Sequence, residues 1–118
     1  MAATRETVLA YLRAIEHNEQ DAFLHADAEV IEHPNRLNPA GVRYDRPALL
    51  AAAARGAAVM ASQRYDVRTM IIDGDRAAVQ IAWTGNLRDG QTMTAQLCSI
   101  IELRDGQVWR QEQYDCFE

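Results

Sequence analysis

The sequence lacks any long hydrophobic run. No apolar stretch approaches the roughly 20 residues that a membrane-spanning helix needs. The N-terminal residues include the charged pair Arg5 and Glu6 and contain no apolar signal-peptide segment. We therefore expect a soluble, cytoplasmic protein with no membrane partner.

The sequence also contains fewer basic than acidic residues. The chain has 12 basic residues against 17 acidic ones, which gives a net charge of −5 and a pI near 5.1. Nucleic-acid binding normally requires a basic stripe, whereas these arginines are scattered among acids. The composition therefore predicts no nucleic-acid partner.

Residues that hold metals or cofactors are few. The two cysteines, Cys98 and Cys116, have neither metal-binding nor redox spacing, and Cys98 is expected to be buried in an apolar strand. The three histidines, His17, His25 and His33, are spread over two predicted helices and a strand. With no glycine-rich phosphate loop either, the sequence predicts no metal and no cofactor.

What is present suits one domain with one hydrophobic core. The chain has 118 residues, of which 48% are hydrophobic and 25% charged, close to the globular average. It contains no linker-like stretch, low-complexity segment or solenoid repeat. We therefore expect a single domain over residues 1–118.

The front half has the spacing of helices around one strand. Apolar residues three and four apart, such as Val8 and Leu12, indicate the first helix, and Asp45 is a suitable N-cap before Pro47. The expected elements are a helix over 4–17, a short helix over 22–24 capped by Asn18, a strand over 28–33, a loop over 34–44 and a helix over 48–61.

The back half alternates apolar and polar residues between Asp-Gly turns. This pattern predicts strands over 65–72, 77–87, 93–103 and 108–116, joined as an antiparallel meander. One face is strongly apolar and should meet the helices. The other face is mixed and suits a dimer interface. The faces of the last strand stay ambiguous, so Glu112, Gln113 and Asp115 are all candidates for the inner side.

Four segments resemble the SnoaL-like branch of the nuclear transport factor 2-like superfamily, which is related to ketosteroid isomerase. They are YLRAIEHNEQDAF (11–23), HADAEVIEHP (25–34), IELRDGQV (101–108) and QYDCF (113–117). The resemblance covers nearly the whole chain. It implies an α+β cone in which N-terminal helices pack on a curved, mainly antiparallel sheet that encloses a pocket. It also implies a small-molecule ligand and a homodimer formed through the sheet.

The resemblance assigns three candidate catalytic residues. Tyr11 matches the oxyanion-binding tyrosine of the isomerase, and His33 falls where that family places its general-base carboxylate. A core tyrosine and a histidine with structural hydrogen bonds are the alternatives. Glu32 should point to the opposite side of the strand from His33, which makes it the fallback acid or base.

Further residues are assigned to ligand binding. Ser99 matches the isomerase's second oxyanion donor, although a backbone-bonded serine is the alternative, and Trp83 should wall the pocket. Gln113 stands where SnoaL-like cyclases carry an aspartate, and because glutamine is no general base, this counts against aldol cyclisation. Asn35 and Tyr44, with Arg36, lie on the long loop and are expected at the pocket mouth.

Two functions therefore stay open. The first is a small-molecule-binding SnoaL-like protein that acts as a cofactor-independent isomerase, cyclase or hydratase on an apolar or aromatic substrate. In it, His33 would be the base, and Tyr11 with Ser99 would stabilise an oxyanion. The alternative is a non-catalytic ligand-binding or dimeric accessory domain.

Overall fold

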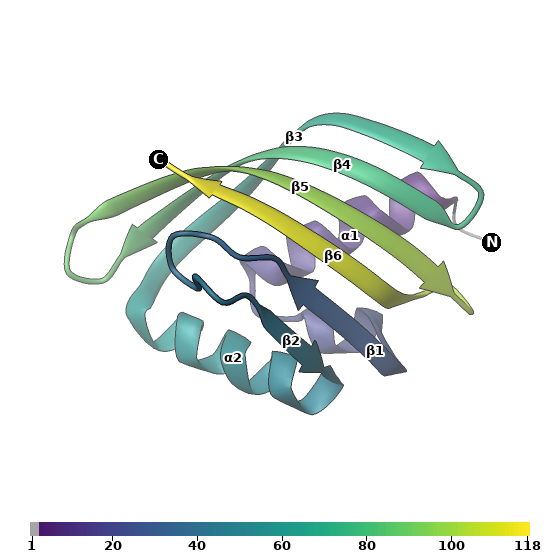
Figure 1. The fold of residues 1–118 in the computed structure, drawn as a ribbon, viewed down its shortest axis with the longest axis horizontal. Coiled ribbons are helices and arrows are strands. Elements are labelled where there is room, and N and C mark those ends of the chain that lie inside the picture. Colours follow the sequence, from purple (N-terminus) through teal and green to yellow (C-terminus); the bar gives the residue numbers. More distant parts are fainter. Residues whose placement is uncertain (1–2) are drawn as a thin grey trace.

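The structure, a computed structural model, describes residues 3–118 and contains helices at one side of a six-stranded sheet (Figure 1). In chain order the elements are α1 (Thr4–Glu16), the 3-10 helix η1 (Gln20–Phe23), β1 (Leu24–Glu32), β2 (Val42–Asp45), α2 (Arg46–Val59), β3 (Met60–Asp73), β4 (Arg76–Leu87), β5 (Thr92–Arg104) and β6 (Gln107–Phe117). None of the helices in this described part is long and apolar enough to cross a membrane.

The six strands form one curved, unclosed sheet in the order β2-β1-β6-β5-β4-β3. Consecutive strands β3 to β6 pair antiparallel, which confirms the meander expected from the turn residues. Among the strands of the described residues, β1 and β6 are the pair that runs parallel, so the first and last strands of the chain lie side by side in the sheet. Helix α1 packs against β3 and β4, and α2 contacts β1, β2 and β3 (Figure 1). The expected α+β cone is confirmed.

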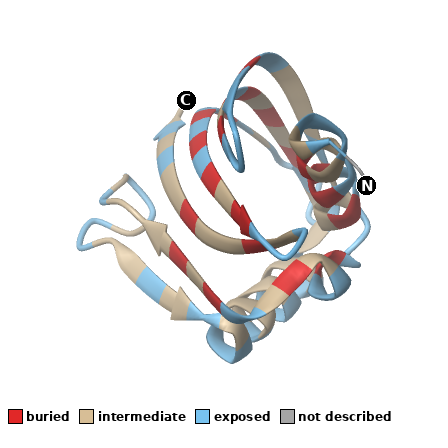
Figure 2. Cartoon of the chain, turned by 90° about the vertical axis from the view of Figure 1, so that its right-hand side faces the viewer, coloured by how far each residue is buried: buried red, intermediate tan, exposed pale blue. Residues whose placement is uncertain are grey.

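The hydrophobic core lies on the inner face of the sheet. Figure 2 shows buried residues recurring along the strands with less buried ones between them, as the period of two requires. Val79, Ile81 and Ile101 on this face are fully buried. Cys98, by contrast, is exposed. The expectation of a buried Cys98 was wrong because Leu97 and Ser99 point inward and leave Cys98 on the outer face.

Helix α1 ends through a residue with left-handed backbone geometry. Asn18 has φ of 59°, and the N–H of Glu19 bonds to the Ala14 carbonyl at 2.8 Å. Asparagine is one of the few residues that tolerate this conformation after a helix. Asn18 therefore terminates α1, whereas the expectation that it caps the following helix was wrong.

The N-terminus of α2 follows the expected chemistry. Asp45 Oδ1 accepts a hydrogen bond from the Ala48 N–H at 2.9 Å, and Pro47 lies in the first turn. Such a cap contributes about 1 kcal/mol to helix stability. The predicted apolar stripe of α2, including Leu49 and Ala53, lies half-buried along the wall of a pocket.

Three boundaries differ from the expected ones because of sheet pairing. Strand β1 begins at Leu24, which pairs with Val108 across a bulge in the parallel ladder. The predicted loop over 34–44 contains the start of β2, which pairs with the end of β1. Strand β3 begins at Met60, because pairing with Leu87 draws the chain out of α2. Local patterns do not reveal such long-range partners.

Candidate active site

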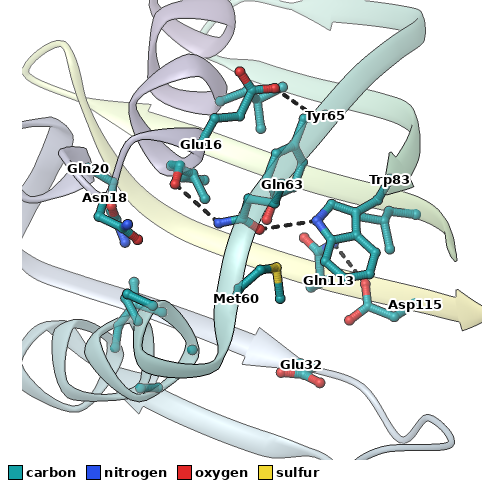
Figure 3. A pocket seen from close by; sticks show the side chains of 18 of the residues that line it. Glu16, Asn18, Gln20, Glu32, Met60, Gln63, Tyr65, Trp83, Gln113 and Asp115 are labelled. Atoms are coloured by element: carbon teal, nitrogen blue, oxygen red, sulfur yellow. Dashed lines mark hydrogen bonds between the residues drawn. The ribbon is translucent and has the colours of Figure 1, made fainter. Parts of the chain in front are cut away.

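A pocket of about 510 Å³ lies between the helices and the inner face of the sheet (Figure 3). This volume is within the range of ligand sites in proteins. Apolar and aromatic side chains from every layer of the fold form much of its wall, among them Leu12, Ile15, Val30, Leu49, Met60, Trp83, Met93, Leu97 and Phe117. The polar groups on this apolar background are therefore the candidates for chemistry.

Glu32, at the end of β1, faces the pocket, whereas His33 does not line it. Val30 is buried on the inner face, so strand alternation places Glu32 inward and His33 outward. The split between these two neighbours follows the expectation, but the expected assignment of His33 to the pocket was wrong. That assignment rested on the general-base position of the related family, whereas the inner face of β1 is set by buried residues such as Val30.

His33 instead belongs to a cluster on the outer face of the sheet. Its ring stacks on Tyr114 with the centroids 4.3 Å apart and the planes tilted by 12°. Its Nε2 lies 2.9 Å from Glu112 Oε1. These contacts match the alternative of a histidine with structural hydrogen bonds.

The loop after β1 holds the carboxylate of Glu32. The side-chain amides of Asn35 and Asn38 both donate to Glu32 Oε1, at 2.8 and 2.9 Å. Asn35 does not line the pocket, so its expected place at the pocket mouth was wrong, and its contact with the site is through Glu32. Two donors on one oxygen orient the carboxylate and leave Oε2 without a protein hydrogen bond in the described residues.

Asp115, on β6, is the second carboxyl group with an unusual environment in the pocket. Burial raises its pKa, a hydrogen bond from Gln113 acts in the opposite direction, and the negative charge of Glu32 raises the pKa further. The net pKa of Asp115 lies above its usual value. A raised pKa suits a group that holds a proton near an ionised partner.

A chain of side-chain hydrogen bonds leads from α1 to Asp115. The Tyr11 hydroxyl donates to Gln111 Oε1 at 2.7 Å, and Gln111 Nε2 donates to Gln113 Oε1 at 3.0 Å. Gln113 Nε2 then donates to Asp115 Oδ1 at 2.8 Å, while Ser99 Oγ also donates to Gln113 Oε1. Figure 3 shows Gln113 beside Asp115 on β6.

The orientation of the Gln113 amide sets the direction of this chain. Gln113 turns its NH₂ group toward Asp115 and its oxygen toward Ser99 and Gln111. Gln111 then presents its oxygen to Tyr11. Both hydroxyl protons therefore point along the chain and away from the open pocket.

This arrangement bears on the expected oxyanion donors. Tyr11 is 2% exposed and Ser99 is 1% exposed, and both line the pocket. Burial, with a smaller contribution from Tyr65, raises the pKa of the Tyr11 phenol. To donate to a ligand, either hydroxyl would first have to break its bond to a glutamine side chain, buried Gln111 for Tyr11 and half-buried Gln113 for Ser99, which costs free energy.

Trp83 forms part of the aromatic wall, as the alternation of β4 led us to expect. Its indole N–H donates to Gln63 Oε1 at 3.1 Å, and Gln63 Nε2 donates to the Ile15 carbonyl at 3.2 Å (Figure 3). A Cβ on Gly85 would come within 2.5 Å of the Trp83 ring. Because glycine has no Cβ, the Trp83 ring can pack directly against the backbone of Gly85 on the same strand.

Two further tyrosines line the pocket. Burial raises the pKa of Tyr65, and the charges of Asp115 and Glu16 add to the shift. Tyr44 lies at the wall as the sequence suggested, and burial followed by the charge of Glu32 raises its pKa. Both phenols therefore stay protonated at neutral pH.

Strand alternation could have identified Gln113 and Asp115 as pocket residues, although the sequence left the inner face of their strand undecided. Gln111, Gln113 and Asp115 share one face of β6, and this face proves to be the inner one. Asp115 therefore lines the pocket in the regular register of the strand, while Glu112 lies on the outer face beside His33. Gln20, in η1, also lines the pocket and had no sequence signal.

The site's chemistry is limited by the residue types available. In residues 3–118 no three side chains of His, Cys, Asp or Glu are grouped to hold a metal ion. The whole sequence contains no lysine, so no side-chain amine is available to form a Schiff base with a carbonyl ligand. Proton transfer between carboxyl groups and a ligand is compatible with what the pocket offers.

The chain matches the SnoaL-like domain family over residues 8–111, which is most of its length. The pocket residues Gln113, Asp115 and Phe117 lie after the matched range. The protein therefore belongs to the SnoaL-like family. No curated protein matches it significantly.

Solved structures share the fold at low sequence identity. AusH from Aspergillus nidulans has a TM-score of 0.82 at 15% identity, covering 95% of this chain and 82% of that one. IdmH from Streptomyces antibioticus, named as a proposed polyketide cyclase, has a TM-score of 0.79 at 16% identity, covering 97% of this chain and 92% of that one. A protein from Catenulispora acidiphila with a ketosteroid isomerase-like fold was solved in complex with trimethylamine. It has a TM-score of 0.77 at 16% identity, covering 95% of this chain and 86% of that one.

Proposed function

We propose that this SnoaL-like protein binds a small apolar or aromatic molecule and performs cofactor-independent acid–base chemistry on it, such as isomerisation, cyclisation or hydration. The observation that carries the proposal is the pair of carboxyl groups, Glu32 and Asp115, in one largely apolar pocket. The small ligand in the Catenulispora structure and the cyclase name of IdmH support a ligand-binding role.

The two carboxyl groups have unlike surroundings, which supports separate roles. Glu32 is oriented by two amide donors on one oxygen, and its other oxygen would accept a proton from carbon or water. Asp115, whose pKa is raised, would hold a proton and donate it to a developing oxyanion. A carboxyl group whose pKa is raised by its surroundings is a common general acid in such sites.

An exchange experiment tests this chemistry without a known substrate. The bicyclic aromatic ketone 2-tetralone has acidic α-protons, and their replacement by deuterium in D₂O is visible by proton NMR. The wild-type protein should accelerate the exchange over buffer, and Glu32→Gln should reduce the acceleration about 10²- to 10⁴-fold.

His33→Ala is the matched control, because it changes the next residue on the opposite face of the strand. It should retain the wild-type exchange rate. No acceleration by the wild-type protein, or an equal loss in both variants, would contradict the proposed roles.

A non-catalytic ligand-binding role is the second candidate, and one observation favours it. The Tyr11 and Ser99 hydroxyls already donate to the side chains of Gln111 and Gln113, so neither is free as an oxyanion donor. Under this role the pocket would bind 2-tetralone without accelerating its exchange.

The outer face of the sheet supports a homodimer, which also remains a proposal. Ile71, Ala78 and Ile100 lie opposite one another on β3, β4 and β5. Ile71 is 66% exposed, and Tyr114 on the same face is 46% exposed. An exposed apolar row of this kind suits an interface between copies. A cytoplasmic location remains a prediction from the sequence.

A further inference from the structure

The charged groups of the pocket all have one sign. Its lining includes the carboxyl groups of Glu16, Glu32 and Asp115 and contains no arginine, lysine or histidine. Glu16 is compensated, because Arg13 Nη1 lies 2.6 Å from its Oε2 and the Tyr65 N–H donates to the same oxygen. Neither of the other two carboxyl groups forms an ion pair within residues 3–118.

Three hydrogen-bond donors of the pocket are already paired inside the protein. The donors of Tyr11, Ser99 and Trp83 are each bonded to a glutamine oxygen. On the acceptor side, Gln20 lines the pocket, is only 7% exposed, and its Oε1 has no hydrogen-bond partner among the described residues. A buried acceptor without a partner is unfavourable, so this oxygen independently indicates a ligand with N–H or O–H donors.

We propose that the ligand of this pocket is a small apolar amine in its protonated form, with the ammonium group facing Glu32 and Asp115 and the apolar part against Trp83 and Phe117. This inference rests on the proposed function of the pocket as a ligand site and specifies the charge of its ligand.

Electrostatics supports this charge class. A carboxylate in an apolar site is unfavourable unless a cation or a proton compensates it. Burial and the charge of Glu32 raise the pKa of Asp115, and a cation beside the two carboxyl groups would relieve this unfavourable charge. An ammonium group supplies both the positive charge and the donors, and aromatic faces attract cations. An anionic ligand would instead place a further negative charge beside Glu32.

Three ligands of nearly equal size separate charge from apolar contact: benzylammonium, benzyl alcohol and benzoate. Binding is followed by NMR through the two tryptophan indole N–H signals, which Trp83→Phe assigns. Trp83 lines the pocket, whereas Trp109 does not and lies against Arg104 and Arg110. The Trp109 signal therefore reports non-specific effects within the same sample.

Benzylammonium should shift the Trp83 signal and bind at least about tenfold more tightly than benzoate, because the carboxyl groups of the pocket attract a cation and repel an anion. The Glu32→Gln, Asp115→Asn double variant should lose this preference and keep its affinity for benzyl alcohol. Glu112→Gln, which removes a carboxylate from the outer face, should keep the preference.

Equal or tighter binding of benzoate, unchanged cation binding in the double variant, or no shift of Trp83 with benzylammonium would overturn the inference. Its failure differs from that of the proposed chemistry. Accelerated 2-tetralone exchange without amine binding would leave the chemistry standing and refute the amine ligand. Amine binding without any exchange would do the reverse.

Discussion

Glu32 and Asp115 line the same pocket from adjacent strands that lie at opposite ends of the sequence, and the charge of Glu32 raises the pKa of Asp115. The two carboxyl groups share the pocket because β1 and β6 pair parallel, with Glu32 opposite Gln113. Asp115 comes two residues later on the same face. The electrostatic coupling between them is therefore a product of topology.

The stability of the protein should depend on the ionisation of Asp115. Its pKa is higher in the folded state than in the unfolded chain, so protonation stabilises the fold. This contribution is complete below the unfolded pKa, about pH 4, and is lost as pH rises through the folded pKa. Asp115→Asn should therefore become increasingly stable relative to wild type between about pH 4 and pH 7.

Paired thermal melts across this pH range measure the effect. Asp27→Asn removes a carboxyl group at an exposed position outside the pocket and serves as the control for the loss of a surface charge. A difference between wild type and Asp115→Asn that shrinks as pH rises would contradict the sign of the shift.

Tyr11→Phe should destabilise the protein by about 1–3 kcal/mol, because it leaves Gln111 Oε1 buried without its donor. Urea unfolding gives the free energy directly. The control is Tyr114→Phe, which removes a hydroxyl from a half-exposed ring and should change stability by less than about 0.5 kcal/mol. Equal effects of the two substitutions would show that the hydrogen-bonded chain contributes nothing.

Gly85→Ala should disturb the aromatic wall of the pocket. The added Cβ would lie 2.5 Å from the Trp83 ring and 3.0 Å from Met60 Sδ. Overpacking of this kind costs about 1–3 kcal/mol, and the displaced ring should change its fluorescence.

The control for this change is Gly56→Ala in α2. No atom lies within 4 Å of a Cβ at this position, and alanine is the better helix former. It should stabilise the protein by about 0.5–1 kcal/mol. Destabilisation by both substitutions would show that the close packing of Trp83 against Gly85 is not the cause of the effect.

Ile100→Glu should weaken the proposed dimer. Ile100 lies in the apolar row on the outer face of the sheet, where a charge would have to be buried on association. Sedimentation equilibrium should show dissociation at higher protein concentration than for wild type. Ala54→Glu adds the same charge to an exposed position of α2 and should not affect association. A wild-type protein that stays monomeric at high concentration would refute the interface.

Much of the fold was predictable because its signals are local. The Asp-Gly turns and alternating strands after residue 65 predicted the meander, and Asp45 and Pro47 predicted the start of α2. The short strand β2 was not predictable, because its residues form a strand by pairing with the end of β1.

The candidate site was only partly predictable. Tyr11, Trp83, Ser99, Gln113, Tyr44 and Glu32 all line the pocket, as lining or fallback residues expected from the resemblance or from alternation. His33 was assigned to the pocket from a family position, and the burial of Val30, which sets the inner face of β1, is known only from the structure. Asp115 stayed one of three candidates because the sequence left the inner face of the last strand undecided, although alternation grouped it with Gln113.

The sequence by itself determined the local elements, the apolar inner face and the lack of lysine, because these depend on residue type and spacing. Only the tertiary structure decided which side of β1 and β6 faces the pocket, and so that Glu32 and Asp115 line the same pocket. It also showed that Tyr11 and Ser99 donate to glutamines. The reason is that charge coupling and hydrogen-bond partners depend on distances between residues far apart in the chain, which only the pairing of the strands establishes.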